Sequence, residues 1–154
     1  FFIDTSNGRI NVTSSKNALN GYQKSKCFFC FEYISIIKKS DFLSDVDHFF
    51  PDMLKGTGFS GYVDGIWNLV LSCKSCNRGE EGKFAKLPSI KLVERLNKRN
   101  EYFCSSHHPL RETIMSQTGS TTEQRRSFLQ KSFNEAKDKL IHTWEPKPKG
   151  ISTF

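Results

Sequence analysis

Short apolar segments separated by polar turns make up the first half of the chain, whereas the second half repeats its apolar residues at helical spacing. We predict a strand pair over residues 1–12, turning at Asn7-Gly8, and a short helix over residues 14–24. Three further strands are expected, at residues 31–37, 42–50 and 67–72. Between the last two, the glycine-rich residues 55–65 predict a loop.

Beyond Pro88, apolar residues recur every three to four positions, which predicts three helices. Ser89 is suited to cap the first, Gly119 to end the second, and residues 120–123 have capping-box spacing before the third. Another helix is expected to open at Cys73 and to run towards Leu87. Residues 146–150 are interpreted as a frayed basic tail. The pattern therefore predicts an α+β fold with a C-terminal helical extension.

Composition narrows the class of protein. The 154 residues suit one domain, and 23 Lys+Arg against 16 Asp+Glu give a net charge of +7, compatible with a polyanionic partner. No apolar run approaches the roughly 18–20 residues of a membrane span, and no signal peptide is visible, so no membrane partner is expected. Because four of the five cysteines form Cys-x-x-Cys pairs, we expect a reducing, cytoplasmic location. The chain begins at Phe1 without a methionine, and we expect it to be a fragment of a larger protein.

Two Cys-x-x-Cys pairs carry the strongest chemical signal. Two such pairs can close a tetrahedral zinc site, and their separation exceeds that of a simple zinc ribbon, so an inserted element must lie between them. We predict one structural zinc ion, while Cys104 is expected to be a buried helix thiol. The predicted zinc ligands are Cys27, Cys30, Cys73 and Cys76.

Residues with carboxylate, imidazole and amide side chains lie in the segment between the two cysteine pairs and directly after the second pair. Asp47-His48 ends a predicted strand, Asn68 opens the next one, and Asn77 directly follows the second cysteine pair, with Arg78-Gly79 and Lys83 behind it. In this order and spacing the motifs resemble the HNH endonucleases, in the version of the ββα-metal fold with a four-cysteine zinc cluster. The resemblance implies a nuclease core over residues 26–87, with a lead-in over residues 1–25, a helical extension over 88–145 and a tail over 146–154.

The resemblance also implies a role for each matching residue. His48 would be the general base that activates water, Asp47 a metal ligand, and Asn68 a brace for the loop that orients the histidine. Asn77 falls where many members carry a second metal-binding histidine. Asp47 and Asn77 would offer oxygen ligands only, which is typical of magnesium, with manganese as a working substitute. Asp45 is expected to lie a strand repeat further back, out of reach.

The function implied is hydrolysis of DNA, expected to be double-stranded, with Arg78 and Lys83 contacting phosphates. The setting implied is the nuclease module of an antiviral defence, restriction or mobile-element protein. The alternatives are a zinc-ribbon module that binds nucleic acid or protein without cutting it, and a ribonuclease or secreted toxin domain of the same fold. The set of Asp47, His48 and Asn68 distinguishes a nuclease from a binding module, because a pure binding module has no need of these residues.

Overall fold

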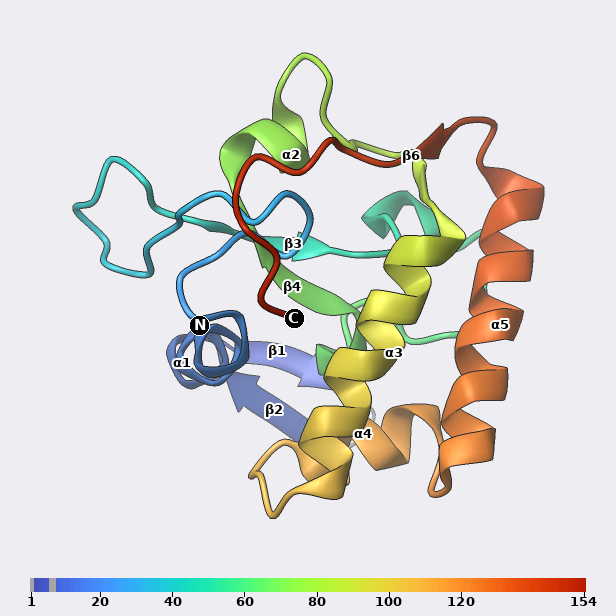
Figure 1. Ribbon diagram of the computed structural model, residues 1–154. Helices are drawn as coiled ribbons and strands as arrows, with labels where there is room; N and C mark the ends of the chain where they lie inside the picture. Colours follow the sequence, from blue (N-terminus) through green and yellow to red (C-terminus); the bar gives the residue numbers. More distant parts are fainter. Residues whose placement is uncertain (1, 6–7) are drawn as a thin grey trace.

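Helices and short two-stranded sheets alternate along the chain in the computed structural model, which describes residues 2–5 and 8–154 (Figure 1). Strand β1 (Phe2–Thr5) pairs antiparallel with β2 (Gly8–Asn11), and α1 (Val12–Gln23) follows at once. This strand pair and helix confirm the prediction, although part of the predicted Asn7-Gly8 turn lies outside the described residues. Mixed helix and sheet content confirms the α+β class.

Two strands and a short helix form the centre of the molecule. Strand β3 (Asp45–His48) pairs antiparallel with β4 (Leu69–Ser72), so that His48 lies opposite Leu69. Helix α2 (Lys74–Arg78) follows β4 and contacts β3. At the other edge, buried Gln23 exchanges two hydrogen bonds with the backbone of Leu71, at 2.8 and 3.0 Å, and so joins the end of α1 to β4.

The segment after the first cysteine pair differs from its prediction. Residues 31–37 form no continuous strand; they make isolated bridges, Lys26 with Tyr33 and Ser35 with Leu43. Phe31 has a positive φ of 65°, which turns the chain away from an extended path directly after the cysteine turn. The apolar, β-branched composition was therefore overridden by the geometry of that turn.

Helix α2 is also shorter than predicted and does not run to Leu87. The N–H group of Gly79 closes the last turn on Ser75 O at 3.0 Å, and the chain then folds back. The N–H group of Lys83 donates to Cys76 O at 2.6 Å, and Phe84 continues the turn at a φ of 46°. Because the chain returns to α2, the side chain of Lys83 is carried into the interior.

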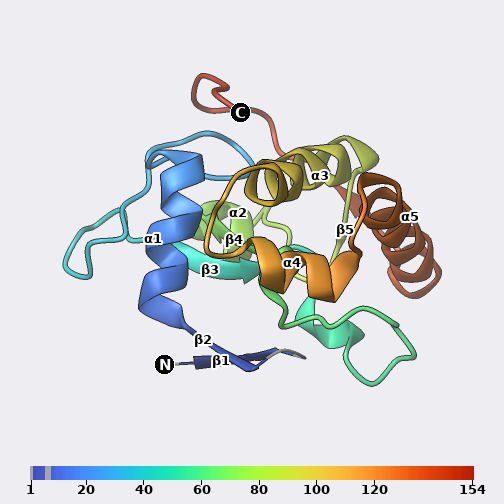
Figure 2. The ribbon, with the colours of Figure 1, turned by 90° about the horizontal axis from the view of Figure 1, so that it is seen from below.

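Three helices form the C-terminal extension, as predicted: α3 (Ile90–Ser105), α4 (Arg111–Thr118) and α5 (Thr122–Lys139). Ser89 caps α3 and Gly119, at a φ of 139°, ends α4. The capping box of α5 uses Thr121 and Gln124, one residue later than expected. Figure 2 places α1 on one side of β3 and β4 and these three helices on the other. None of the helices in the described part of the chain has the length and apolar character needed to cross a membrane.

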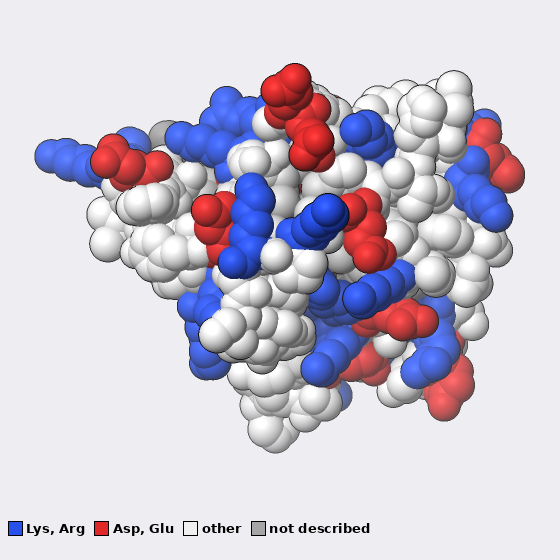
Figure 3. Space-filling model, turned by 45° about the horizontal axis from the view of Figure 1, so that its top comes forward, with Lys and Arg blue, Asp and Glu red and all other residues white. Residues whose placement is uncertain are grey.

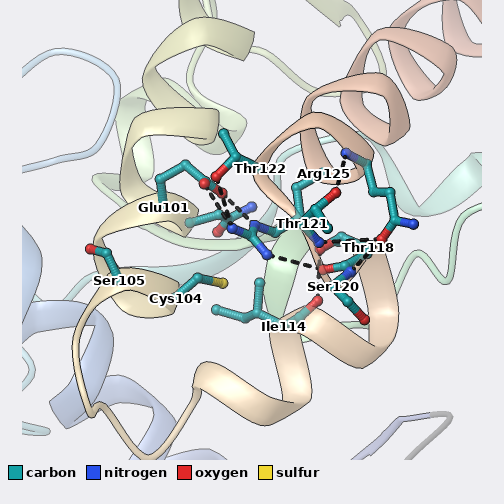
Figure 4. Close-up of polar contacts among 12 residues, drawn as sticks. Glu101, Cys104, Ser105, Ile114, Thr118, Ser120, Thr121, Thr122 and Arg125 are labelled. Carbon is teal, nitrogen blue, oxygen red and sulfur yellow. Dashed lines mark hydrogen bonds and ion pairs between the residues drawn. The ribbon is translucent and has the colours of Figure 1, made fainter.

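Two buried arginines fasten this extension. Arg125 of α5 makes a two-pronged ion pair with Glu101 of α3, at 2.6 and 2.9 Å, and donates to Gly119 O (Figure 4). Fully buried Arg99 of α3 donates to the carbonyl oxygens of Ile66 and Trp67, in the 3-10 turn Ile66–Asn68 before β4, and of Leu69, the first residue of β4. Burial lowers the pKa of Arg99 to about 9. Helix α3 therefore holds the backbone on either side of Asn68.

The C-terminal segment is ordered against the core, contrary to the prediction of a frayed tail. After the parallel pair of β5 (Leu87–Pro88) and β6 (Thr143–Trp144), the chain returns to the first cysteine turn. The N–H groups of Lys149 and Gly150 both donate to Cys30 O, at 2.8 and 3.1 Å. The ring of Phe154 lies 4.8 Å from that of Phe31 and 6.0 Å from that of Phe28.

Candidate metal and catalytic site

Four cysteine side chains from two distant parts of the chain meet in the interior. Cys27 and Cys30 lie in the turn after α1, and Cys73 and Cys76 at the start of α2. Their four Sγ atoms lie within 4.8 Å of one another. The Sγ atoms of Cys30 and Cys73 are 3.8 Å apart, about the edge length of a tetrahedron with Zn–S bonds of about 2.3 Å. The donor set therefore fits a structural metal such as zinc.

Backbone groups around the cluster favour thiolates. The N–H group of Cys73 points at Cys27 Sγ at 3.3 Å, and that of Cys76 at Cys73 Sγ at 3.4 Å. Hydrogen bonds from the Cys30, Cys73 and Cys76 thiols hold the pKa of Cys27 well below its usual range, whereas hydrogen bonds with Cys27 raise the pKa of Cys30 and Cys76. Thiolate is the form that binds a metal ion. Cys104 is buried in α3 outside this cluster, as expected.

The side chain of Asp47 points into the core and lies against Lys83. Asp47 is 6% exposed and Lys83 1% exposed, with Asp47 Oδ1 3.5 Å from Lys83 Nζ. Lys83 Nζ also donates to His48 O at 2.9 Å. Burial raises the pKa of Asp47 to about 6 against the opposing effect of Lys83, and Asp47 Oδ2 has no hydrogen-bond partner. This corrects the prediction for Lys83: its ammonium group is enclosed by protein and is not available to a phosphate.

Asn77 of α2 contacts Asp45, two residues before Asp47 on the same face of β3. Asn77 Nδ2 donates to Asp45 Oδ2 at 2.9 Å, and the guanidinium of Arg78 donates to both oxygens of that carboxylate, at 3.0 and 3.3 Å. Asp45 therefore reaches Asn77, one of the two predicted magnesium ligands, although it was expected to lie a strand repeat out of reach. Among the described contacts, none joins Asp47 directly to Asn77. Arg78 is largely exposed, and its phosphate contact stays a prediction.

Asn68 is fully buried and fastens the loop between β3 and β4 at both of its ends. Its Oδ1 accepts from the N–H of Phe50 at 2.8 Å, and its Nδ2 donates to Phe50 O at 3.0 Å and to Val63 O at 2.9 Å. Phe50 follows His48 by two residues, and Val63 directly precedes Asp64. These three hydrogen bonds therefore hold the backbone next to both His48 and Asp64.

The imidazole of His48 lies against a cluster of charged groups from this loop. His48 Nε2 is 2.8 Å from Asp64 Oδ1 and 4.0 Å from Asp52 Oδ1. The ammonium group of Lys55 lies 2.7 Å from Asp64 Oδ2 and 2.8 Å from Asp52 Oδ1. Although burial opposes it, hydrogen bonds from Lys55 and His48 lower the pKa of Asp64. An ionised carboxylate beside the ring can orient the histidine and stabilise the imidazolium that forms when it takes a proton.

Sequence reasoning did not find Asp64, Asp52 or Lys55. The one available signal for Asp64 was its place as the acidic residue of the glycine-rich loop, four residues before Asn68. Its contact with His48 depends on closure of that loop, which spacing does not show. Together, His48, Asp52 and Asp64 also form a group that could hold a metal ion.

Comparisons with protein-family models, with curated proteins and with solved structures found no match to this chain. The site must therefore be interpreted from its own residues and their contacts.

Replacing Asn68 with alanine should destabilise the fold strongly. The change removes three hydrogen bonds and leaves buried groups of Phe50 and Val63 unsatisfied, each costing about 1–3 kcal/mol. Urea unfolding of Asn68→Ala should show a loss of several kcal/mol, while Asn77→Ala, which removes one partly buried contact, should lose far less. Equal stability of the two variants would show that Asn68 does not brace the loop.

Proposed function

We propose that this chain is a metal-dependent endonuclease of the HNH class, which hydrolyses phosphodiester bonds in DNA. The single observation that carries the proposal is the 2.8 Å contact of His48 Nε2 with Asp64 Oδ1, at the end of β3 and beside Asn68. Further support comes from the order of β3, β4 and α2 and from the cysteine cluster at the start of α2. The elements and residues follow the order that the resemblance implies.

His48 is suited to be the general base. Its side chain is 29% exposed, so a water molecule can still reach the imidazole while Nε2 contacts Asp64. In the proposed reaction His48 takes a proton from that water, whose oxygen bonds to the phosphorus in line as the opposite P–O bond breaks and the leaving oxygen takes up a proton from solvent. Asp64 stays ionised through Lys55 and balances the positive charge that develops on the ring.

Magnesium, with manganese as a substitute, is the proposed catalytic ion, and Asp47 and Asn77 are its proposed ligands. These residues fit the ion only in part. Asp47 Oδ2 is a buried oxygen without a hydrogen-bond partner, as a cation ligand would be, but the carboxylate also contacts Lys83, and Asn77 is held by Asp45. When bound, such an ion would offset the negative charge that develops on the phosphate and the leaving oxygen.

The biological setting is proposed on the resemblance alone: the nuclease module of a larger antiviral defence, restriction or mobile-element protein that acts on double-stranded DNA in the cytoplasm. Arg78 supports a polyanionic substrate, because its side chain is 58% exposed beside Asn77, although a phosphate would have to share its guanidinium with Asp45. A shallow groove lined by Lys16, Asp45, Asn77 and Arg78 adjoins β3.

A zinc-ribbon binding module is the second candidate. It is favoured by the enclosure of Asp47 and Lys83, because a module that binds without cutting needs the cysteine cluster and a basic surface but no open carboxylate. A binding module has no use, however, for a partly exposed histidine held by an ionised aspartate. Cleavage decides between the two candidates.

Purified protein retaining its zinc should convert supercoiled plasmid to open-circular or linear DNA when magnesium or manganese is added. It should not do so when weakly bound metal has been removed.

Asn77→His should keep activity but shift its preference towards nickel, cobalt or zinc, because imidazole is the softer ligand. Asp47→Ala should lose activity with every metal, because the carboxylate of Asp45 is already held by Asn77 and Arg78 and does not replace it. Tight plasmid binding without cleavage under all metals would favour the binding module.

A further inference from the structure

A closed arm projects from the body of the protein directly before β3. Residues 35–44 form this arm, which extends to the left in Figure 1, away from helices α3 and α5. The N–H of Ser35 donates to Phe42 O and that of Ser44 to Ser35 O, both at 2.9 Å, which closes the base of the arm. The hydroxyls of Ser35 and Ser40 accept from the N–H groups of Ile37 and Phe42, at 3.0 and 3.1 Å. The shape of the arm is therefore held by its own hydrogen bonds.

Large apolar side chains are exposed on this arm and at its base. The rings of Tyr33 and Phe42 pack edge to face with centroids 5.4 Å apart, yet the two residues are 56% and 59% exposed. Ile37, nearer the tip, is 68% exposed. Apolar side chains that gather on an exposed surface are typical of a binding site.

The charge around these rings favours a polyanion. Lys38 and Lys39 are exposed at the tip, and Figure 3 shows basic atoms at the end of the projection. Lys26 pairs through its backbone with Tyr33, and the groove beside that ring is lined by Lys24 and Lys26. The acidic neighbours are Glu32, whose carboxylate lies 3.9 Å from Lys149 Nζ, and the exposed Asp41. Lysines therefore outnumber carboxylates around the aromatic pair.

We propose that Tyr33, Ile37 and Phe42, flanked by Lys38 and Lys39, bind single-stranded DNA, the rings stacking on unpaired bases and the lysines contacting phosphates. Stacking on aromatic rings together with contacts to a basic surface is how proteins hold single strands without reading their sequence. The arm runs without a break into β3, which carries Asp45 at its start and His48 at its end. This inference rests on the proposed function for the choice of DNA over a lipid surface, and it directs the nuclease to double-stranded DNA that also carries an unpaired segment.

Direct binding tests the arm without requiring cleavage. Fluorescence anisotropy with labelled oligo-dT, in the absence of magnesium, should show at least about a tenfold weaker affinity for the double variant Tyr33→Ala/Phe42→Ala, since stacking contributes strongly to each base bound. Tyr102→Ala, which removes a half-exposed aromatic residue of α3, is the matched control and should bind like the unaltered protein. In Lys38→Ala/Lys39→Ala, the slope of log affinity against log salt should shrink by about 1.4, as expected for two phosphates on a single strand.

A tryptophan variant keeps the test independent of any loss of stability. Tyr33→Trp retains an aromatic face, so it should bind oligo-dT normally and its fluorescence should be quenched on binding. Unchanged affinity of the double alanine variant would overturn the inference, as would arm-dependent binding to phosphatidylserine vesicles but not to oligo-dT. If oligo-dT binding depends on the arm while plasmid is never cleaved, the inference stands and the endonuclease proposal falls.

Discussion

Cys73→Ser should lose the zinc ion and unfold the central part of the protein. The cluster joins the turn after α1 to the start of α2, with all four thiols buried. Structural zinc contributes about 10–16 kcal/mol of apparent binding free energy in small zinc domains, which equals or exceeds the stability of a typical folded domain, about 5–15 kcal/mol. Elemental analysis should find one zinc ion per chain in the unaltered protein and a large deficit in the variant, whose thermal unfolding transition should disappear or fall steeply.

Cys104→Ser provides the matched control. Cys104 is as buried as Cys73, with 6% against 8% exposure, but it lies outside the cluster. It should therefore retain the zinc and lose only the modest free energy of burying a hydroxyl in place of a thiol. A Cys73→Ser protein that keeps a full zinc ion and melts like the unaltered protein would show that the cluster is not the zinc site.

His48→Ala should reduce plasmid cleavage at least about 100-fold, the usual minimum when a general base is removed. Folding should be nearly unaffected, because the ring is partly exposed and its loss leaves Asp64 paired with Lys55. DNA affinity should also hold, since the histidine is proposed to move a proton and not to bind phosphate. The measurements are initial cleavage rates with magnesium, thermal unfolding and oligonucleotide binding on the same preparations.

His142→Ala is the control for this second variant, because His142 is exposed and remote in sequence from the candidate site. It should cut at the rate of the unaltered protein. A His48→Ala protein with unchanged cleavage would remove the histidine from the mechanism. Cleavage lost together with the unfolding transition would assign His48 a structural role instead.

Sequence patterns predicted a helix or strand correctly where that element depends on residues close to one another in sequence. The helices α3, α4 and α5 follow from apolar spacing, from Ser89 at one start and from Gly119 at one end, because caps act within a single turn. The strand predicted over residues 31–37 and the long helix predicted after Cys73 both failed. In each case a turn next to a cysteine pair changes the direction of the chain. The amino-acid composition of the segment does not indicate the direction that such a turn takes.

The sequence by itself determined the α+β class, the helical extension and the four-cysteine set, because helix periodicity and Cys-x-x-Cys spacing are local properties of the chain. Tertiary structure alone decided which polar groups meet. Folding the chain back on α2 buried Lys83 against Asp47, and packing α2 on β3 brought Asn77 to Asp45. Closing the loop on Asn68 placed Asp64 beside His48. These contacts join residues far apart in sequence. Their geometry is set by the packing of whole helices and strands, which cannot be predicted from the spacing of residues along the chain.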